Sequence, residues 1–415
     1  MQFVNKLLIA FLFFSLVSCN QSDIDTTDSH SITGQWRGVL QSPGGELPFG
    51  IEITKKNGIY STKILNGPER VDTSSTTFEN NHLQISMSWF DAIIEARMID
   101  GGRKLSGTWT KTTSGKNKSS SLPFTASRNY EYRFQQELKQ PKDTPVTGSW
   151  KVVFSDENSD SKAVAEFSQQ GQIVNGTFLT ATGDYRYLAG VANDGKLHLS
   201  AFDGAHAFLF KADIDGDKIS NGHFWSRDSY HATWTALKSD DTSGYLQNSW
   251  EMNKATGKVK FTFEDIDGKL VSLTDERFKN KPVLINLFGT WCPNCNDEAP
   301  VLAKLYDQYH QQDLEIIGLA FEFTQDIQRD KKQLAIFKKR HGINYPLLLA
   351  GGNDKSSATK VLGFLDKVKS YPTTLFLDRN HDVVKINTGF SGPGTGEYYT
   401  QLVNELEEEI KKLLN

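Results

Sequence analysis

The C-terminal part of this chain contains the segment from which its fold is predicted, Pro282-Val-Leu-Ile-Asn-Leu-Phe-Gly-Thr-Trp-Cys-Pro-Asn-Cys295. Its apolar run, 283–288, is typical of a buried strand, and a Gly-Thr turn follows it. The next residues have helical spacing, so Cys292 is predicted at a helix N-terminus, where unpaired N–H groups and the helix dipole favour a thiolate. Pro293 suits the first helical turn, because its missing N–H has no intrahelical partner there. Two cysteines separated by two residues at this point predict a redox site.

The N-terminus has the layout of an export signal. Lys6 precedes an apolar run, 7–17, that is too short to span a bilayer comfortably. The sequence Leu16-Val17-Ser18-Cys19 resembles the lipobox of bacterial lipoproteins. This resemblance implies cleavage after Ser18 and a lipid on Cys19. The alternative is an uncleaved anchor helix. The resemblance predicts a protein of the bacterial cell envelope, tethered to a membrane and facing the periplasm or the cell surface.

Cysteine use supports redox chemistry. The chain has three cysteines, so if Cys19 is lipidated only Cys292 and Cys295 remain. An exported protein with one CxxC and no structural disulfide uses that pair for chemistry. A zinc site is not predicted, since neither a second CxxC nor a close His pair is present. No flavin or nicotinamide fingerprint appears, so no cofactor is expected, and reducing equivalents would come by thiol exchange from another protein. The net charge of −4, without a basic stripe interleaved with aromatics, argues against nucleic acid.

The N-terminal half contains an internal repeat. Thr33-Gly34-Gln-Trp36 returns as Thr147-Gly148-Ser-Trp150, an offset of 148 − 34 = 114, and Leu83-Gln-Ile-Ser86 returns as Leu197-His-Leu-Ser200 at the same offset. Both copies consist of short alternating apolar and polar runs broken by Gly, Asn and Asp, a pattern typical of half-buried antiparallel strands. Each copy is therefore predicted to be a small all-β barrel or sandwich. The repeated tryptophans are expected in its core, namely Trp36, Trp109, Trp150 and Trp234.

The last two-fifths of the chain alternates strands with helices, which predicts a mixed sheet covered on both faces. The strands are expected at 259–263, 270–273, 283–288, 314–321, 345–349, 373–377 and 383–387, and the principal helices at 298–311, 325–341 and 397–414. The whole chain is thus predicted to be multidomain, with a signal peptide (1–18), a tether (19–32), β repeat 1 (33–127), a linker (128–146), β repeat 2 (147–237), a second linker (238–255) and an α/β unit (256–415).

The α/β unit resembles the thioredoxin superfamily, and within it the exported TlpA/ResA-like group. The matching residues are Asn286-Leu-Phe-Gly-Thr-Trp-Cys-Pro-Asn-Cys295, Pro300 and Ser370-Tyr-Pro372-Thr-Thr374. The resemblance implies a thioredoxin-like fold, with Cys292 as the attacking thiolate and Cys295 as the resolving thiol. It also implies that Pro372 follows a cis peptide bond beside the active disulfide.

The resemblance further implies a substrate surface around the two sulfurs. Trp291 would cover the exposed sulfur, and Pro293, Tyr371 and Thr373 would contact the substrate. The loop at Pro372 would present its backbone edge to an extended substrate chain.

One position departs from many thioredoxins, in which a buried Asp six residues before the first Cys handles the proton of the resolving thiol. That position is Asn286, which cannot titrate. The TlpA/ResA-like resemblance instead implies a Glu on the following strand, and Glu322 lies at that place. A carboxyl buried near two sulfurs would have a raised pKa, so Glu322 is predicted to be the acid/base. The alternative is a solvated charge at a strand end.

These patterns together favour a membrane-tethered, exported thiol–disulfide oxidoreductase that reduces protein or small-molecule disulfides and draws electrons from a membrane dithiol donor. One alternative is a binding protein, in which the β repeats hold a ligand or envelope partner and the redox unit is a docking platform. Another is a thiol peroxidase. It is disfavoured because Gly289 and Ile285 stand where a peroxiredoxin has its Thr and Pro.

Overall fold

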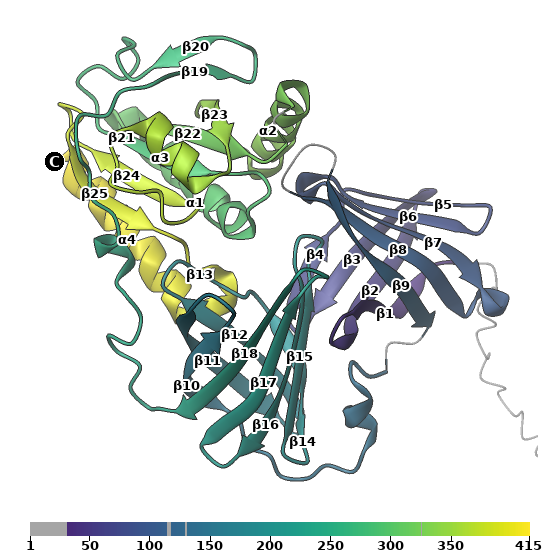
Figure 1. Cartoon of the computed structure of the whole chain (residues 1–415). Helices are drawn as coiled ribbons and strands as arrows, with labels where there is room; N and C mark the ends of the chain where they lie inside the picture. Colours follow the sequence, from purple (N-terminus) through teal and green to yellow (C-terminus); the bar gives the residue numbers. More distant parts are fainter. Residues whose placement is uncertain (1–30, 114–117, 129–130, 325) are drawn as a thin grey trace, which may run out of the picture.

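The computed structural model describes residues 31–113, 118–128, 131–324 and 326–415 (Figure 1). The predicted signal peptide, the lipidation site Cys19 and nearly all of the predicted tether lie outside these residues. None of the helices in the described part of the chain combines the length and the apolar character needed to cross a bilayer. The structure contains two β barrels followed by an α/β unit (Figure 1).

The first barrel closes by pairing β2 with β3, so that β1, β2, β3, β5, β6, β7, β8 and β9 form an eight-stranded antiparallel ring, and β4 extends β3 at one end. The structure therefore selects the barrel among the two predicted architectures. Its strands are Gly34–Ser42 (β1), Gly45–Lys56 (β2), Ile59–Asn66 (β3), Glu69–Asp72 (β4), Ser75–Glu79 (β5), His82–Met87 (β6), Ala92–Ile99 (β7), Lys104–Thr112 (β8) and Ser119–Arg128 (β9).

The second barrel repeats the topology strand for strand, closing through β11 and β12 and carrying β13 where the first carries β4. The internal repeat in the sequence thus corresponds to two copies of one fold. Its strands are Gly148–Ser155 (β10), Asp160–Gln170 (β11), Ile173–Thr180 (β12), Gly183–Asp184 (β13), Leu188–Asn193 (β14), Lys196–Phe202 (β15), Ala207–Asp215 (β16), Lys218–Ser226 (β17) and Tyr230–Lys238 (β18).

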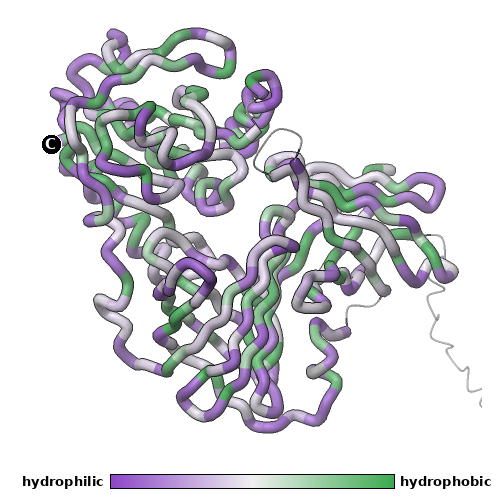
Figure 2. The backbone as a smooth tube through the Cα atoms, in the orientation of Figure 1, coloured by the Kyte–Doolittle hydropathy of each residue, from purple (hydrophilic) through white to green (hydrophobic). Residues whose placement is uncertain are grey.

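Each barrel is filled mainly by its own side chains, and Phe202, Ala205, Ala207 and Leu209 of the second barrel also join the core cluster of the first. Figure 2 shows hydrophobic and hydrophilic residues intermingled along the barrel strands, as expected where one strand face is buried. The four tryptophans predicted in the core are at most 1% exposed. Trp36 and Trp150 are equivalent in detail, because each indole N–H donates to the carbonyl four residues earlier, at 3.0 and 2.9 Å.

The two barrels are joined by an apolar contact. Phe202 of β15 packs on Phe49 and Trp109 of the first barrel, with ring centroids 4.4 and 5.6 Å apart. The side-chain amide of Asn66 holds the Phe202 backbone at both ends, donating to its carbonyl at 2.7 Å and accepting its N–H at 3.1 Å. Part of the predicted linker 128–146 joins this contact, since Arg133 is buried and donates to Ser200 Oγ at 2.9 Å.

The α/β unit has one seven-stranded sheet, ordered β20-β19-β23-β22-β21-β24-β25, in which β21, β22 and β23 are parallel. The helix α3 begins within the polar segment 351–360. The strands are Thr262–Asp265 (β19), Leu270–Ser272 (β20), Val283–Phe288 (β21), Glu315–Glu322 (β22), Leu347–Gly352 (β23), Thr373–Leu377 (β24) and Val383–Thr388 (β25), and the helices are Pro293–Tyr309 (α1), Ile327–His341 (α2), Lys355–Leu362 (α3) and Glu397–Leu414 (α4).

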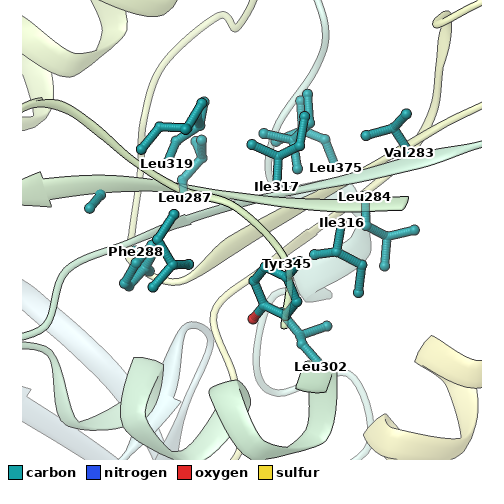
Figure 3. Packing of buried hydrophobic residues seen from close by; sticks show 14 of the residues in the cluster. Val283, Leu284, Leu287, Phe288, Leu302, Ile316, Ile317, Leu319, Tyr345 and Leu375 are labelled. Carbon is teal, nitrogen blue, oxygen red and sulfur yellow. The ribbon is translucent and has the colours of Figure 1, made fainter. Parts of the chain in front are cut away.

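The central strands β21 and β22 are buried along their whole length. Figure 3 shows why: Ile317 and Leu319 lie on one side of the sheet, and Ile316 lies on the other with Leu302 of α1. The predicted linker 238–255 also packs on this unit at its C-terminal end, where Trp250 donates to Glu405 at 2.9 Å. Strand β21 thus runs through the core and ends at Phe288, four residues before Cys292.

Candidate active site

Cys292 and Cys295 are paired as a disulfide, with Cα atoms 5.2 Å apart. Cys292 is the N-cap of α1, and its Sγ accepts the backbone N–H of Cys295 at 3.3 Å. Pro293 is the first residue of the helix. The predicted position of Cys292 at a helix N-terminus is confirmed. In the reduced state this N–H and the helix dipole would stabilise negative charge on the Cys292 sulfur.

Trp291 is anchored beside the motif. Its indole N–H donates to the Phe321 carbonyl at 2.9 Å, and its ring meets the ring of Tyr371 edge to face. Gly289 makes room for this placement, because a Cβ there would lie 2.2 Å from the indole nitrogen. The tryptophan is thereby fixed as one wall of the site.

The loop before β24 lies against the disulfide. The Tyr371–Pro372 peptide bond is cis, as predicted. The Sγ of Cys292 lies 3.6 Å from the Tyr371 carbonyl oxygen. Tyr371 and Thr373, the expected substrate contacts, are only 6% and 1% exposed, and the two cysteines are 5% and 2% exposed. The sulfur of Cys292, which was predicted to be exposed, is thus almost completely buried.

Glu322, the predicted acid/base, is a buried residue and not a solvated charge. Thr290 donates to its carboxyl twice, from the backbone N–H and from the hydroxyl, each at 2.8 Å. Burial raises the pKa of Glu322 to about 7, while these two hydrogen bonds act in the opposite direction. A carboxyl with this pKa exchanges a proton near neutral pH. Its hydrogen-bond partner, Thr290, lies two residues before Cys292 in the sequence.

A second buried carboxyl, Glu298, was not identified from the sequence. It accepts hydrogen bonds from Asn286 at 2.7 Å and from Thr374 at 2.9 Å, and burial raises its pKa to about 7. Glu298 follows Cys295 by three residues on α1, so the two side chains share a helix face. This spacing is the signal that would have revealed it. Asn286 cannot titrate, but it donates a hydrogen bond to Glu298, which can.

Comparison with known proteins gives the same chemistry. The model of the AhpC/TSA family matches residues 256–386. The thiol-disulfide oxidoreductase ResA of Halalkalibacterium halodurans is 32% identical over 156 residues, covering 37% of this chain and 74% of that protein. The chain belongs to the ResA-like thiol–disulfide oxidoreductases.

The ResA of Bacillus subtilis is 33% identical over 138 residues, covering 33% of this chain and 69% of its own. The crystal structure of a thioredoxin-family thiol:disulfide interchange protein from Chlorobium tepidum is 21% identical, with a TM-score of 0.31, over 39% of this chain and 98% of that chain. The family match begins at residue 256, so both barrels lie outside it.

In this ResA-like oxidoreductase the barrels reach the active-site helix. Arg186 of the second barrel forms ion pairs with Glu69 of the first barrel at 2.7 Å, with Asp203 at 3.0 Å and with Asp297 of α1 at 2.5 Å. Burial alone would lower the pKa of Arg186, but the three carboxylates outweigh it and raise that pKa. One cation thus links all three units next to the CxxC motif.

The motif residue Asn294 is held from the same side. Its side-chain amide donates to Phe390 O at 2.9 Å and lies 3.3 Å from the carboxylate of Asp184 in β13. Gly183 and Gly389 allow this close packing. A Cβ on Gly183 would lie 2.7 Å from the Asn294 amide, and one on Gly389 would lie 2.3 Å from the backbone of Thr182. The turn before β13 therefore covers one flank of the disulfide.

Proposed function

We propose that this chain is an exported, membrane-tethered oxidoreductase whose Cys292–Cys295 dithiol reduces disulfide bonds of substrates outside the cytoplasm. The observation that carries the proposal is the disulfide at the N-cap of α1 with two buried carboxyls of raised pKa near it. The apolar N-terminal run and the lipobox-like text ending at Cys19 support export and a lipid anchor.

In the reaction, the Cys292 thiolate attacks one sulfur of a substrate disulfide and expels the other as a thiolate, which takes up a proton. Cys295 then loses its proton and attacks the Cys292 sulfur, releasing the second substrate thiol and leaving the enzyme oxidised. A donor dithiol in the membrane, oxidised in turn, would return the two electrons by the same exchange. Neither direction requires a cofactor.

Cys295 is only 2% exposed, so its proton needs an acceptor inside the protein. Glu322 is the residue proposed for this role, and Glu298, three residues after Cys295 on α1, is the second candidate. A positioned base of this kind typically contributes about 10²–10⁴-fold to rate. The step to examine is the resolution of the mixed disulfide, since only there must Cys295 be deprotonated.

The first test uses the Cys292→Ser and Cys295→Ser variants with both insulin and bis(2-hydroxyethyl) disulfide, so that protein and small substrates are each offered. Cys292→Ser should abolish reduction of both. Cys295→Ser should stop at a mixed disulfide with the substrate, detectable by mass. Full activity of Cys292→Ser would disprove the proposal.

The second test separates the two carboxyls. In Glu322→Gln and Glu298→Gln, release of the second thiol is followed against pH after rapid mixing. The variant that removes the acceptor should lose the inflection near pH 7 and slow by about 10²-fold at that pH. If both variants keep the wild-type profile, neither carboxyl accepts the proton.

A further inference from the structure

A cavity of about 510 Å³ lies where the three units meet beside the redox motif. Trp291 and Pro293, the two sequence neighbours of Cys292, line it from the α/β unit. Its opposite walls come from strands and turns of both barrels. The turn before β13 covers one flank of the motif, and the cavity lies beside Trp291 and Pro293, the residues on either side of Cys292. Its volume falls in the range of small-molecule sites.

The walls of the cavity differ in chemistry. The side nearest the sulfurs is apolar, formed by Trp291, Pro293 and Phe323. The barrel side is polar and includes hydroxyl groups as well as Lys111 of β8 and Arg227 of the turn after β17. A ligand that fits both sides has an apolar centre and a polar or charged end.

The two cations on the barrel side are poorly compensated. Lys111 is only 6% exposed, and its Nζ donates to the Phe90 carbonyl at 2.9 Å, which uses one of its three N–H groups. Burial and the like charge of Arg227 lower the pKa of Lys111 to about 7, although Asp203 and Glu322 oppose this. Burial likewise lowers the pKa of Arg227, and Asp228 only partly offsets it.

The other titratable groups of the cavity are already engaged. His206 shares a hydrogen bond of 2.9 Å with Asp203, and Asp228 accepts the hydroxyl of Ser120 at 2.6 Å. Buried charges in proteins are normally paired. An anion placed between Lys111 and Arg227 would supply the missing partner, as charge-assisted hydrogen bonds do for carboxylates.

The backbone of Arg227 gives independent support. Its φ is +55°, a left-handed conformation that glycine or asparagine adopts at lower cost at a turn. The strain is fixed by the hydrogen bond from its N–H to the Ala207 carbonyl at 2.9 Å. A bulky cation held in this conformation beside a cavity is typical of a functional position.

We propose that this cavity is the substrate site and that it takes a small disulfide bearing carboxylate groups. The substrate sulfur lies against Trp291 and Pro293, and a carboxylate is bound by Arg227 and Lys111. The inference rests on the proposed reduction of disulfides and names the class of substrate. The exchange is the one already written: Cys292 bonds to one substrate sulfur, the other leaves as a thiol, and Cys295 releases the second.

The test uses three disulfides of similar size and different charge: 3,3′-dithiodipropionate, bis(2-hydroxyethyl) disulfide and cystamine, with insulin as the protein disulfide. The full chain is reduced, freed of reductant and mixed with each, and its oxidation is followed by tryptophan fluorescence. Each rate is divided by the rate of free dithiothreitol with the same disulfide, which removes intrinsic reactivity. The expected order is dithiodipropionate, then the neutral disulfide about tenfold slower, then cystamine and insulin.

Three variants give the charge dependence. Arg227→Gln should lower the corrected rate for dithiodipropionate about tenfold, bringing it to that of the neutral disulfide. Asp228→Asn should raise it, since Asp228 is the one carboxylate among the described residues that line the cavity. Arg103→Gln, at the opposite end of β8 and exposed, is the matched control and should change nothing.

The outcomes separate the two proposals. Oxidation of the chain by all four probes without a charge order, or fastest by insulin, overturns the substrate inference and leaves disulfide reduction in place. Failure of every probe to oxidise the reduced chain overturns both.

Discussion

Glu322→Gln tests whether the buried carboxyl is protonated in the folded protein. The pKa of this group rises from 4.5 to about 7 on burial. Between these two pH values the unfolded chain has released the proton and the folded chain still holds it, so the free energy of unfolding falls as pH rises. The contribution is present in full below pH 4.5 and lost above pH 7. At 1.36 kcal/mol for each pH unit between the two values, the loss is about 3 kcal/mol.

Glutamine reproduces the protonated acid. Its carbonyl can accept the Thr290 N–H, and its amide can donate to the Thr290 hydroxyl, so both hydrogen bonds of the site are kept. The variant does not titrate. Its stability relative to the wild type should therefore rise by about 3 kcal/mol between pH 4.5 and pH 8. Glu298 titrates in both proteins and cancels from the difference.

The assay is urea unfolding of the oxidised full chain at several pH values. The transition of the α/β unit is identified as the one that moves when the disulfide is reduced, because Cys292 and Cys295 lie only in that unit. Glu276→Gln, an exposed position, is the control and should give a difference that does not vary with pH. A flat difference for Glu322→Gln would mean that its carboxylate is ionised in the fold, and the acid/base assignment would fail.

Two further changes test how the units are held together, and a third tests the packing of Trp291 inside the α/β unit. Arg186→Met leaves three carboxylates at the junction without their cation. It should destabilise the docked arrangement of the units by about 3–5 kcal/mol, measured as faster proteolysis between them. An unchanged rate of proteolysis would contradict this. Phe202→Ala should cost about 3–5 kcal/mol of barrel docking, seen as two separate barrel transitions in urea in place of a joint one. Gly289→Ala should displace the Trp291 indole and break its hydrogen bond to Phe321, which a shifted tryptophan emission spectrum would report; an unchanged spectrum would disprove the packing argument.

Predictions from the sequence succeeded where the cause is local. The strand at 283–288 and the helix N-terminus at Cys292 follow from apolar periodicity and from the position of Pro293, which act over a few residues. The two β copies were predicted from a sequence pattern that recurs at a constant offset. The two barrels have the same strand order, as that prediction requires. Glu298 was not predicted, because its burial against Asn286 and Thr374 is decided by contacts that only the fold brings together.

Sequence patterns predict the redox pair, its place at the start of a helix and the duplication of the β unit, because each depends on residues close together in the chain or on simple repetition. Tertiary structure alone decided that the barrels close, that Glu322 is buried, and that Arg186 joins Glu69 to Asp297. The cavity also depends on tertiary structure, since Lys111, Arg227 and Trp291 in its wall come from three different units. No local pattern encodes such contacts, because they arise only when separate segments of the chain pack together.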